Sequence, residues 1–242
     1  VLSHAHIDHC GRLPLLVKRG FRGPVYTNAA CADLLPILLN DSAELAAREA
    51  ERHNRNRKPG ALPFEPAYSA DDAAAVYQQL QSLPYDEQRQ VLPGVTVRVR
   101  EAGHILGSSS VELWLEEAGV RRKLVFSGDL GQYDSPILLD PHRFEQADVV
   151  LMETTYGDRR HRGREATELE LGQILAQAAR DGGNVVIPAF AIGRSQHLLY
   201  LFGRYYDAWN LSRWKVFLDS PMAIAASRIY WKHRERYDSE AQ

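Results

Sequence analysis

Three histidines and an aspartate stand within the first nine residues of the chain, VLSHAHIDH, directly after two apolar positions. Neutral imidazole nitrogens and carboxylate oxygens are the ligands that suit a borderline divalent ion such as zinc. Alternate side chains of an extended segment point to one side, so we expect His4, His6 and Asp8 to converge on one point. His9 follows Asp8 directly and faces elsewhere, which suits a second ion beside the first. A polar turn rich in histidine is the alternative, and four such residues in this order disfavour it.

Two later loops offer further ligands, and each follows an expected strand. The loop EAGHILGSSS (101–110) presents His104 between glycine-flanked turns, and FSGDLG (126–131) presents Asp129. Each loop is weak evidence alone, because a Ser-Gly-Asp turn is common and a histidine after a strand is more often a surface residue. Three strand-end loops that each deliver a ligand-type residue are what a metal site at the edge of a β-sandwich requires.

Composition limits the class of protein. The 242 residues are 45% hydrophobic and 25% charged, which is typical of a globular chain with one large domain or slightly more. With a formal net charge of -2, the chain as a whole does not attract a polyanion such as nucleic acid. A nucleic-acid partner must therefore be held by a local basic patch or by bound metal. Cys10 and Cys31 make neither a disulfide framework nor a zinc finger, which favours a reducing, cytoplasmic setting. No stretch approaches the roughly 18 apolar residues of a transmembrane helix, so we expect no membrane partner. The chain begins without Met at what reads as a strand end, and we expect a fragment.

Local patterns predict a hairpin-rich first part. The expected elements are a short helix in 11–20, a strand in 23–28, a mostly helical stretch in 29–55 with a kink or break at Pro36, a loop in 56–66, a helix in 73–80 after a Ser69–Asp72 capping box, a strand in 94–102, a hairpin in 110–129 that turns at Ala118 and Gly119, and a buried strand in 148–155.

From about residue 165 helices and strands alternate, which predicts a parallel sheet distinct from the hairpins of the first part. The expected elements are a helix in 165–180 that ends at Gly182 and Gly183, a buried strand in 184–190, a helix in 193–206, a strand in 214–219, and a helix that begins with Ser220 as N-cap and Pro221 at its first position. We place the boundary between the two parts near Tyr156.

Several of these motifs resemble one family. SHAHIDH matches the H-x-H-x-D-H signature of the metallo-β-lactamase superfamily, and the loops of His104 and Asp129 resemble its third and fourth metal motifs. METTYGDRRH (152–161) resembles motif A of the β-CASP nucleases, with Glu153 as the acidic residue. VVIPAFAIGRSQHLLYLF (185–202) and LDSPMA (218–223) resemble the opening of the β-CASP domain. The segments HIDHCGRLP and GHILGSS most resemble the RNA-cleaving branch. This branch includes the endonuclease subunit of the cleavage and polyadenylation specificity factor and its prokaryotic relatives.

The resemblance implies a fold. It implies an α/β chain in which residues 1–156 form part of a metallo-β-lactamase αββα sandwich, without its N-terminal strands and its C-terminal part. Residues 157–242 are then the first part of an α/β β-CASP domain with a parallel sheet. The flavin-linked di-iron branch fits less well, since it typically carries an acidic residue where this chain has His6.

The resemblance also implies a site and a reaction. His4, His6 and His104 would bind one zinc ion, Asp8 and His9 a second, and Asp129 would bridge them. Asp8 would also orient the nucleophile, a metal-bound hydroxide, and Glu153 would pair with a catalytic histidine. That histidine and a further ligand of the second ion belong to family motifs not found in this chain, so we expect the second site to be incomplete here.

The function implied is that of a zinc-dependent endoribonuclease that hydrolyses phosphodiester bonds of single-stranded RNA in RNA processing or decay. Arginine forks and helix N-termini suit phosphates, which makes Arg159, Arg160, Arg194 and Ser220 candidate RNA contacts. A solvated loop and plain helix capping are the alternatives for them. A small-molecule hydrolase of the same superfamily and a non-catalytic RNA-processing scaffold remain as other functions. The sequence leaves open whether the protein forms a homo-oligomer or joins an RNA-processing complex.

Overall fold

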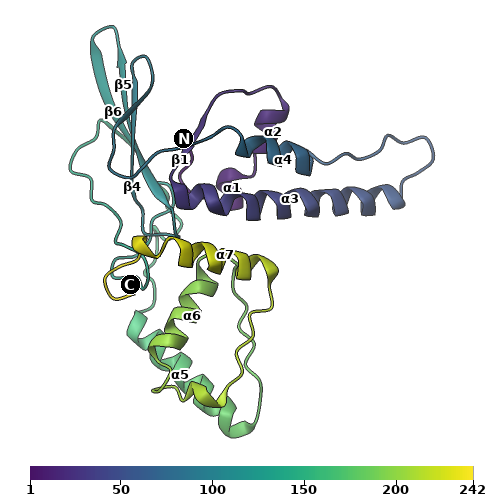
Figure 1. Cartoon of the computed structure of the whole chain (residues 1–242), viewed down its shortest axis with the longest axis vertical. Helices are drawn as coiled ribbons and strands as arrows, with labels where there is room; N and C mark the ends of the chain where they lie inside the picture. The colour runs from purple at the N-terminus through teal and green to yellow at the C-terminus, as the bar shows by residue number, and fades with distance from the viewer. Residues whose placement is uncertain (242) are drawn as a thin grey trace.

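The structure, a computed structural model, describes residues 1–241 and combines a two-stranded and a five-stranded β-sheet with α-helices (Figure 1). The strands are β1 (Val25–Thr27), β2 (Leu80–Ser82), β3 (Arg89–Leu92), β4 (Val95–Glu101), β5 (Ser109–Glu117), β6 (Val120–Phe126) and β7 (Val149–Leu151). The α-helices are α1 (Ile7–Cys10), α2 (Leu13–Lys18), α3 (Ala29–Arg55), α4 (Ala70–Tyr77), α5 (Arg164–Asp181), α6 (Arg194–Arg204) and α7 (Pro221–Lys232), with 3-10 turns at Leu211–Arg213 and Arg234–Arg236.

The larger sheet has the strand order β3-β4-β5-β6-β7. Its first four strands pair antiparallel, and β7 pairs parallel with β6. The β5–β6 hairpin turns at Ala118 and Gly119 as predicted, both with positive φ (50° and 77°). Two such residues give a turn whose twist matches the flanking strands. Alternate residues face one side of a strand, and Val97, Val99 and Val111 are accordingly buried together.

One edge of this sheet collects the loops of interest. The end of β4, the start of β5 and the end of β6 meet there because these strands are antiparallel. The N-terminal segment is attached to the same edge, since the Ser109 N–H donates to the Ser3 carbonyl at 2.8 Å. The loops 102–108 and 127–131 therefore leave the sheet beside the first residues of the chain.

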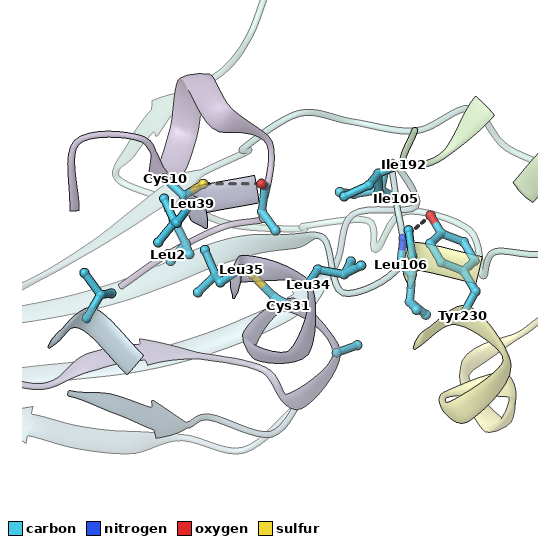
Figure 2. Packing of buried hydrophobic residues seen from close by; sticks show 14 of the residues in the cluster. Leu2, Cys10, Cys31, Leu34, Leu35, Leu39, Ile105, Leu106, Ile192 and Tyr230 are labelled. Carbon is cyan, nitrogen blue, oxygen red and sulfur yellow. Dashed lines mark hydrogen bonds between the residues drawn. The ribbon is translucent and has the colours of Figure 1, made fainter. Parts of the chain in front are cut away.

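The long α3 helix supplies the core beneath these loops. Leu34, Leu35 and Leu39 of α3 are fully buried. They belong to one cluster with Leu106 of the loop after β4 and Tyr230 of α7 (Figure 2). In Figure 1, α7 runs beneath α3, with α5 and α6 below it. The core thus joins the first part of the chain to the helices of the second part.

Of the kink or break predicted at Pro36, the break is wrong, because α3 continues through that residue from Ala29 to Arg55. A proline inside a helix removes one backbone hydrogen bond and costs about 3 kcal/mol. Burial of three leucines on the same stretch contributes about 1.5–3 kcal/mol per side chain, which offsets that loss.

Most of the other predicted elements are confirmed. The Ser69–Asp72 capping box begins α4, and Asn28 caps α3 by accepting the Cys31 N–H. The helix α5 ends at Gly182 in the left-handed conformation (φ 68°). Ser220 caps α7, with Pro221 at its first position. No helix within residues 1–241 is long and apolar enough to cross a membrane.

The parallel sheet predicted for the second part is wrong, because no strand follows β7 in the described residues. Segments 184–190 and 214–219 hold no ladder hydrogen bonds there, and Val186, Phe190 and Phe217 are 88%, 86% and 82% exposed. The predicted strand β7 exists, yet Val149 and Val150 are exposed rather than buried. A strand is buried only when neighbouring strands pair with both of its edges or other elements pack on its faces. β7 is the last strand of the sheet and pairs only with β6. The expected αββα sandwich is therefore present only in part, with sheets that do not close.

Candidate metal centre

His4 and His6 stand on an extended segment that is held on both sides. The Leu2 N–H donates to the Tyr26 carbonyl of β1 at 2.9 Å, and the Ser3 carbonyl accepts from β5. His4 is completely buried as a result. His6 is the last extended residue and the N-cap of α1, with φ -62° and ψ 146°. Both imidazoles thus lie at the loop edge of the large sheet.

The loop that carries His104 lies close against the start of α3. Gly107 has φ +78°, and a Cβ on it would lie 2.5 Å from the Cys31 nitrogen. Asn28, the N-cap of α3, also donates to the Gly107 carbonyl at 2.6 Å. The His104 N–H donates to the Ser108 hydroxyl at 3.0 Å. Only glycine permits this approach, and the cap residue of α3 fixes the loop in place.

Asp129 follows β6 in a loop that is bonded to the His104 loop. The Gly131 N–H donates to the Ala102 carbonyl at 2.8 Å. The preceding Ser127 carbonyl accepts from the Ser110 hydroxyl of β5 at 2.7 Å. Each end of the Asp129 loop is therefore tied to another strand end, which leaves its carboxylate little freedom.

These loops bring four ligand-type atoms together, all within 4.8 Å of one another: one nitrogen each of His4, His6 and His104 and one oxygen of Asp129. The Nδ1 atom of His6 lies 3.2 Å from His4 Nε2 and 3.1 Å from His104 Nε2. The Oδ2 atom of Asp129 lies 3.7 Å from His4 Nε2 and 3.5 Å from His104 Nε2. The residues predicted from three separate stretches of sequence thus converge.

Electrostatics favours neutral imidazoles in this cluster. Burial, followed by the neighbouring histidines, lowers the pKa of His4 to about 2. Burial also lowers the pKa of His6 and of His104, although the Asp129 carboxylate opposes it. Neutral imidazole is the form that binds a metal ion. Three neutral nitrogens and one carboxylate oxygen are a donor set that fits a divalent ion such as zinc.

The expected convergence of Asp8 with His4 and His6 is wrong. The helix α1 begins at Ile7, so the alternation of the extended segment ends before Asp8 is reached. The Asp8 side chain is 74% exposed, and its Oδ2 atom lies 3.6 Å from His9 Nε2. It stands outside the cluster of four ligand-type residues.

His9 lies beside the cluster, with its ring centre 4.0 Å from that of His4. Its Nε2 atom is 3.1 Å from Asp129 Oδ1, whereas Oδ2 of the same carboxylate faces His4 and His104. Its Nδ1 atom lies 3.4 Å from the Ser3 hydroxyl. Oδ1 of Asp129 therefore faces His9, and Oδ2 faces His4 and His104, within one continuous set of imidazoles.

A cleft of about 570 Å³ opens on the cluster, lined by His6, His104, Asp129 and Glu153 among others. Glu153 follows β7 and accepts the Leu130 N–H at 2.7 Å. Burial would raise the pKa of Glu153, but hydrogen bonds from Thr155 and from the Leu130 N–H outweigh it and hold the pKa below its ordinary value. Glu153 is thus an ionised carboxylate beside Asp129, and it accepts a backbone N–H as a purely structural carboxylate also would.

The candidate RNA contacts fall into two groups. Arg194 lines the cleft at the start of α6. Arg159 and Arg160 are exposed outside the cleft lining, and the Arg159 guanidinium lies 5.2 Å from the centre of the Tyr156 ring. Ser220 is outside the lining too, and its hydroxyl accepts the Ala223 N–H at 3.1 Å. The structure therefore brings only Arg194 of this set into the cleft.

Sequence reasoning missed His197 of the cleft wall, and it named Arg164, which also lines the cleft, only as one arginine of a possible phosphate track in 157–164. The signal for His197 was available, because residues three apart on a helix share a face and Arg194 is three residues before it. Arg164 stands in the arginine-rich stretch after motif A, where spacing alone did not separate it from its solvated neighbours.

The chain thus has a cluster of metal-ligand residues on loops at one sheet edge, followed by a helical second part. This arrangement is that of a metal-dependent hydrolase with an added helical domain, and similarity to known families agrees with it. The profile of the Metallo-beta-lactamase superfamily matches residues 1–179, and that of the Beta-Casp domain matches residues 195–242. The chain belongs to the metallo-β-lactamase superfamily and carries part of a β-CASP domain. The family predicted from the motifs is confirmed.

Among curated proteins the chain is similar to Ribonuclease TTHA0252 of Thermus thermophilus, with 36% identity over all of this chain and 51% of that protein. It is similar to the transcription termination factor FttA of Methanothermobacter thermautotrophicus, with 31% identity over 90% of this chain and 32% of that protein. It is also similar to an RNase J-like protein of Methanocaldococcus jannaschii, with 29% identity over 96% of this chain and 49% of that protein. The chain spans about half the length of these relatives or less.

Proposed function

We propose that the protein containing this chain is a metal-dependent ribonuclease that hydrolyses phosphodiester bonds of single-stranded RNA. The observation that carries the proposal is the meeting of four ligand-type atoms from three loops at the mouth of one cleft. Two of the relatives carry ribonuclease names, which supports RNA as the substrate. A cytoplasmic location remains a prediction, consistent with the free, buried Cys10 and Cys31.

The donor set supports zinc as the cofactor. We assign His4, His6 and His104 to a first ion, His9 and Asp8 to a second, and Asp129 to both, because its Oδ1 faces His9 whereas its Oδ2 faces His4 and His104. A bound zinc ion would supply a water of pKa about 7 as a source of nucleophile and would offset charge on the phosphate oxygens. The exposed Asp8 carboxylate would turn toward the ion that His9 holds.

The protein's own groups have separate tasks in this proposal. Asp129 is held by the bonds of its loop, so its carboxylate orients the imidazoles of His4, His9 and His104 without rearrangement. Glu153 stays ionised at neutral pH, so it can orient a proton donor and cannot itself supply the proton to the leaving oxygen. Arg194 faces the cleft and would contact the RNA backbone. Arg159 and Arg160 would contact RNA only outside the cleft, and we propose no direct contact for Ser220.

Cleavage of a labelled single-stranded RNA by the purified protein tests this function. We expect cleavage that stops on chelation, returns with zinc, and falls about 100-fold or more in His6→Ala, because loss of even an indirect partner of a metal ligand typically costs about 10–100-fold. His53→Ala, an exposed histidine at the end of α3, is the matched control and should keep full activity. Hydrolysis of a thioester or lactone with RNA left intact would replace the proposal with a small-molecule hydrolase. Metal-independent RNA binding without cleavage would indicate a scaffold.

A further inference from the structure

One wall of the cleft carries a hydrogen-bond donor that has no acceptor. His197 lies on the first turn of α6, and its Nε2 atom is buried without a partner among the described residues. The same cleft is lined by His6, His104 and Asp129 of the metal centre. A buried polar atom without a hydrogen-bond partner lowers the free energy of unfolding by about 1–3 kcal/mol. Such an atom in a folded protein is therefore a candidate for binding a ligand.

The partner of the other ring nitrogen fixes the tautomer of His197. The Arg194 guanidinium lies 3.4 Å from His197 Nδ1. A guanidinium can only donate, so Nδ1 must accept and the proton of a neutral ring resides on Nε2. Burial, followed by the charges of Arg194 and Arg164, lowers the pKa of His197 to about 4 against the opposing Glu168 carboxylate. The ring is therefore neutral at pH 7, and its Nε2–H has no acceptor among residues 1–241.

The charges around that position favour an anion. Arg164 donates to the Tyr133 carbonyl at 3.3 Å, and within the described residues neither Arg164 nor Arg194 lies at ion-pair distance from a carboxylate. The neighbouring Glu168 carboxylate accepts from the Tyr205 hydroxyl at 2.6 Å. Two guanidiniums without carboxylate partners, together with a neutral N–H donor, match the oxygens of a phosphate group.

We propose that His197, Arg164 and Arg194 form a phosphate-binding subsite that holds an RNA phosphate other than the one at the metal centre. The Nε2–H of His197 donates to a non-bridging oxygen, and the two guanidiniums balance its charge. This inference rests on the proposed ribonuclease function and deepens it, since it says where the strand is held beyond the reacting phosphate. The subsite and the metal centre share one cleft, so both can engage a single strand.

Kinetics of RNA cleavage and metal-free RNA binding together test the subsite. In His197→Leu we expect KM and the dissociation constant for single-stranded RNA in the presence of chelator to rise about tenfold, with kcat and zinc content unchanged. His197→Gln keeps an N–H donor at a similar reach and should stay within about twofold of the parent. Arg164→Gln should weaken binding and reduce the slope of log affinity against log salt by about 0.7. Arg228→Gln, an exposed arginine of α7 outside the cleft lining, is the control for charge and should change neither.

The outcomes separate the subsite from the function. Unchanged KM and RNA affinity in His197→Leu, with the parent cleaving RNA, would overturn the subsite and leave the ribonuclease intact. An equal loss in His197→Gln and His197→Leu would also overturn it, because the donor would then not be what holds the phosphate. A parent protein that binds RNA through His197 but does not cleave it would support the subsite and contradict the ribonuclease.

Discussion

Gly107 shows how a residue without a side chain decides the position of a metal-ligand loop. Its φ of +78° is unfavourable for other residues, and its Cα faces the first turn of α3 at a distance that excludes a Cβ. This close approach, together with the bonds from the His104 N–H to the Ser108 hydroxyl and from the Leu106 N–H to the Tyr230 hydroxyl, fixes the loop that carries the histidine three residues earlier.

Gly107→Ala is therefore expected to lower both stability and zinc affinity. The left-handed conformation alone costs an alanine about 1–2 kcal/mol, and the contact with the Cys31 nitrogen adds to it. Gly60→Ala is the matched control, since Gly60 has φ +83° with no atom within 4 Å of an added Cβ. Denaturant unfolding and zinc titration of both variants measure the difference. Equal losses in the two variants would show that the close approach to α3 does not matter.

Glu101 gives a prediction for pH. Burial raises the pKa of its carboxyl from 4.5 to about 7, although the Gly103 N–H and the Arg236 guanidinium favour the ionised form. Between these values the folded state binds more protons than the unfolded state, so this group's contribution to stability is present below about pH 4.5 and is lost as pH rises through about 7. Glu101→Gln should consequently gain stability relative to the parent at pH 8 compared with pH 5.

Thermal unfolding at the two pH values, with the exposed Glu87→Gln as control, measures that gain. A stability difference between Glu101→Gln and the parent that is the same at both pH values would show that Glu101 ionises normally in the folded protein. The comparison between variants removes the opposing pH dependence of the buried histidines, since all three proteins share it.

At the scale of elements, α7 and the His104 loop are coupled through one buried hydroxyl. Tyr230 of α7 accepts the Leu106 N–H at 3.1 Å, two residues after His104 (Figure 2). The Tyr230 ring is almost fully buried in the cluster that also contains Leu34. A helix of the β-CASP part thus helps to set the position of a metal-ligand loop of the other part.

Tyr230→Phe keeps the ring and removes this acceptor. We expect a loss of about 1–3 kcal/mol, because the Leu106 N–H is left buried and unpaired, together with weaker zinc binding. Tyr206→Phe removes an exposed hydroxyl and should cost almost nothing. Zinc affinity measured by competition with a chromophoric chelator is the deciding quantity. A Tyr230→Phe variant that loses stability but keeps its zinc affinity would limit the hydroxyl to a structural role.

Elements with local signals could be predicted from the sequence, and elements that depend on distant partners could not. The Ser69 capping box and the turn at Ala118 and Gly119 are confirmed because a few neighbouring residues determine them. The predictions of a buried β7 and of strands at 184–190 and 214–219 were wrong. An apolar run indicates a tendency to be buried, but it does not show which strand or helix would pair with it or cover it. The change from extended to helical backbone at Ile7, which moved Asp8 away from His4, left no clear mark in so short a motif.

At the scale of the whole molecule, the account depends on loops from separate strands and a cleft shared by both parts of the chain. The candidate site was predictable for the four clustered residues, since each falls in a motif whose chemistry points to metal binding. The cleft was not, because Arg164 and His197 reach it only through the packing of α5 and α6 against the first part. The domain boundary near Tyr156 stays a prediction.

Anomalous diffraction at the zinc absorption edge, on crystals of the zinc-loaded protein, tests the central claim most directly. We predict an anomalous peak about 2.0–2.2 Å from one nitrogen each of His4, His6 and His104 and from one oxygen of Asp129. The peak should be absent in His6→Ala and retained in His53→Ala. A peak coordinated by other residues, or one of full height in His6→Ala, would contradict the account.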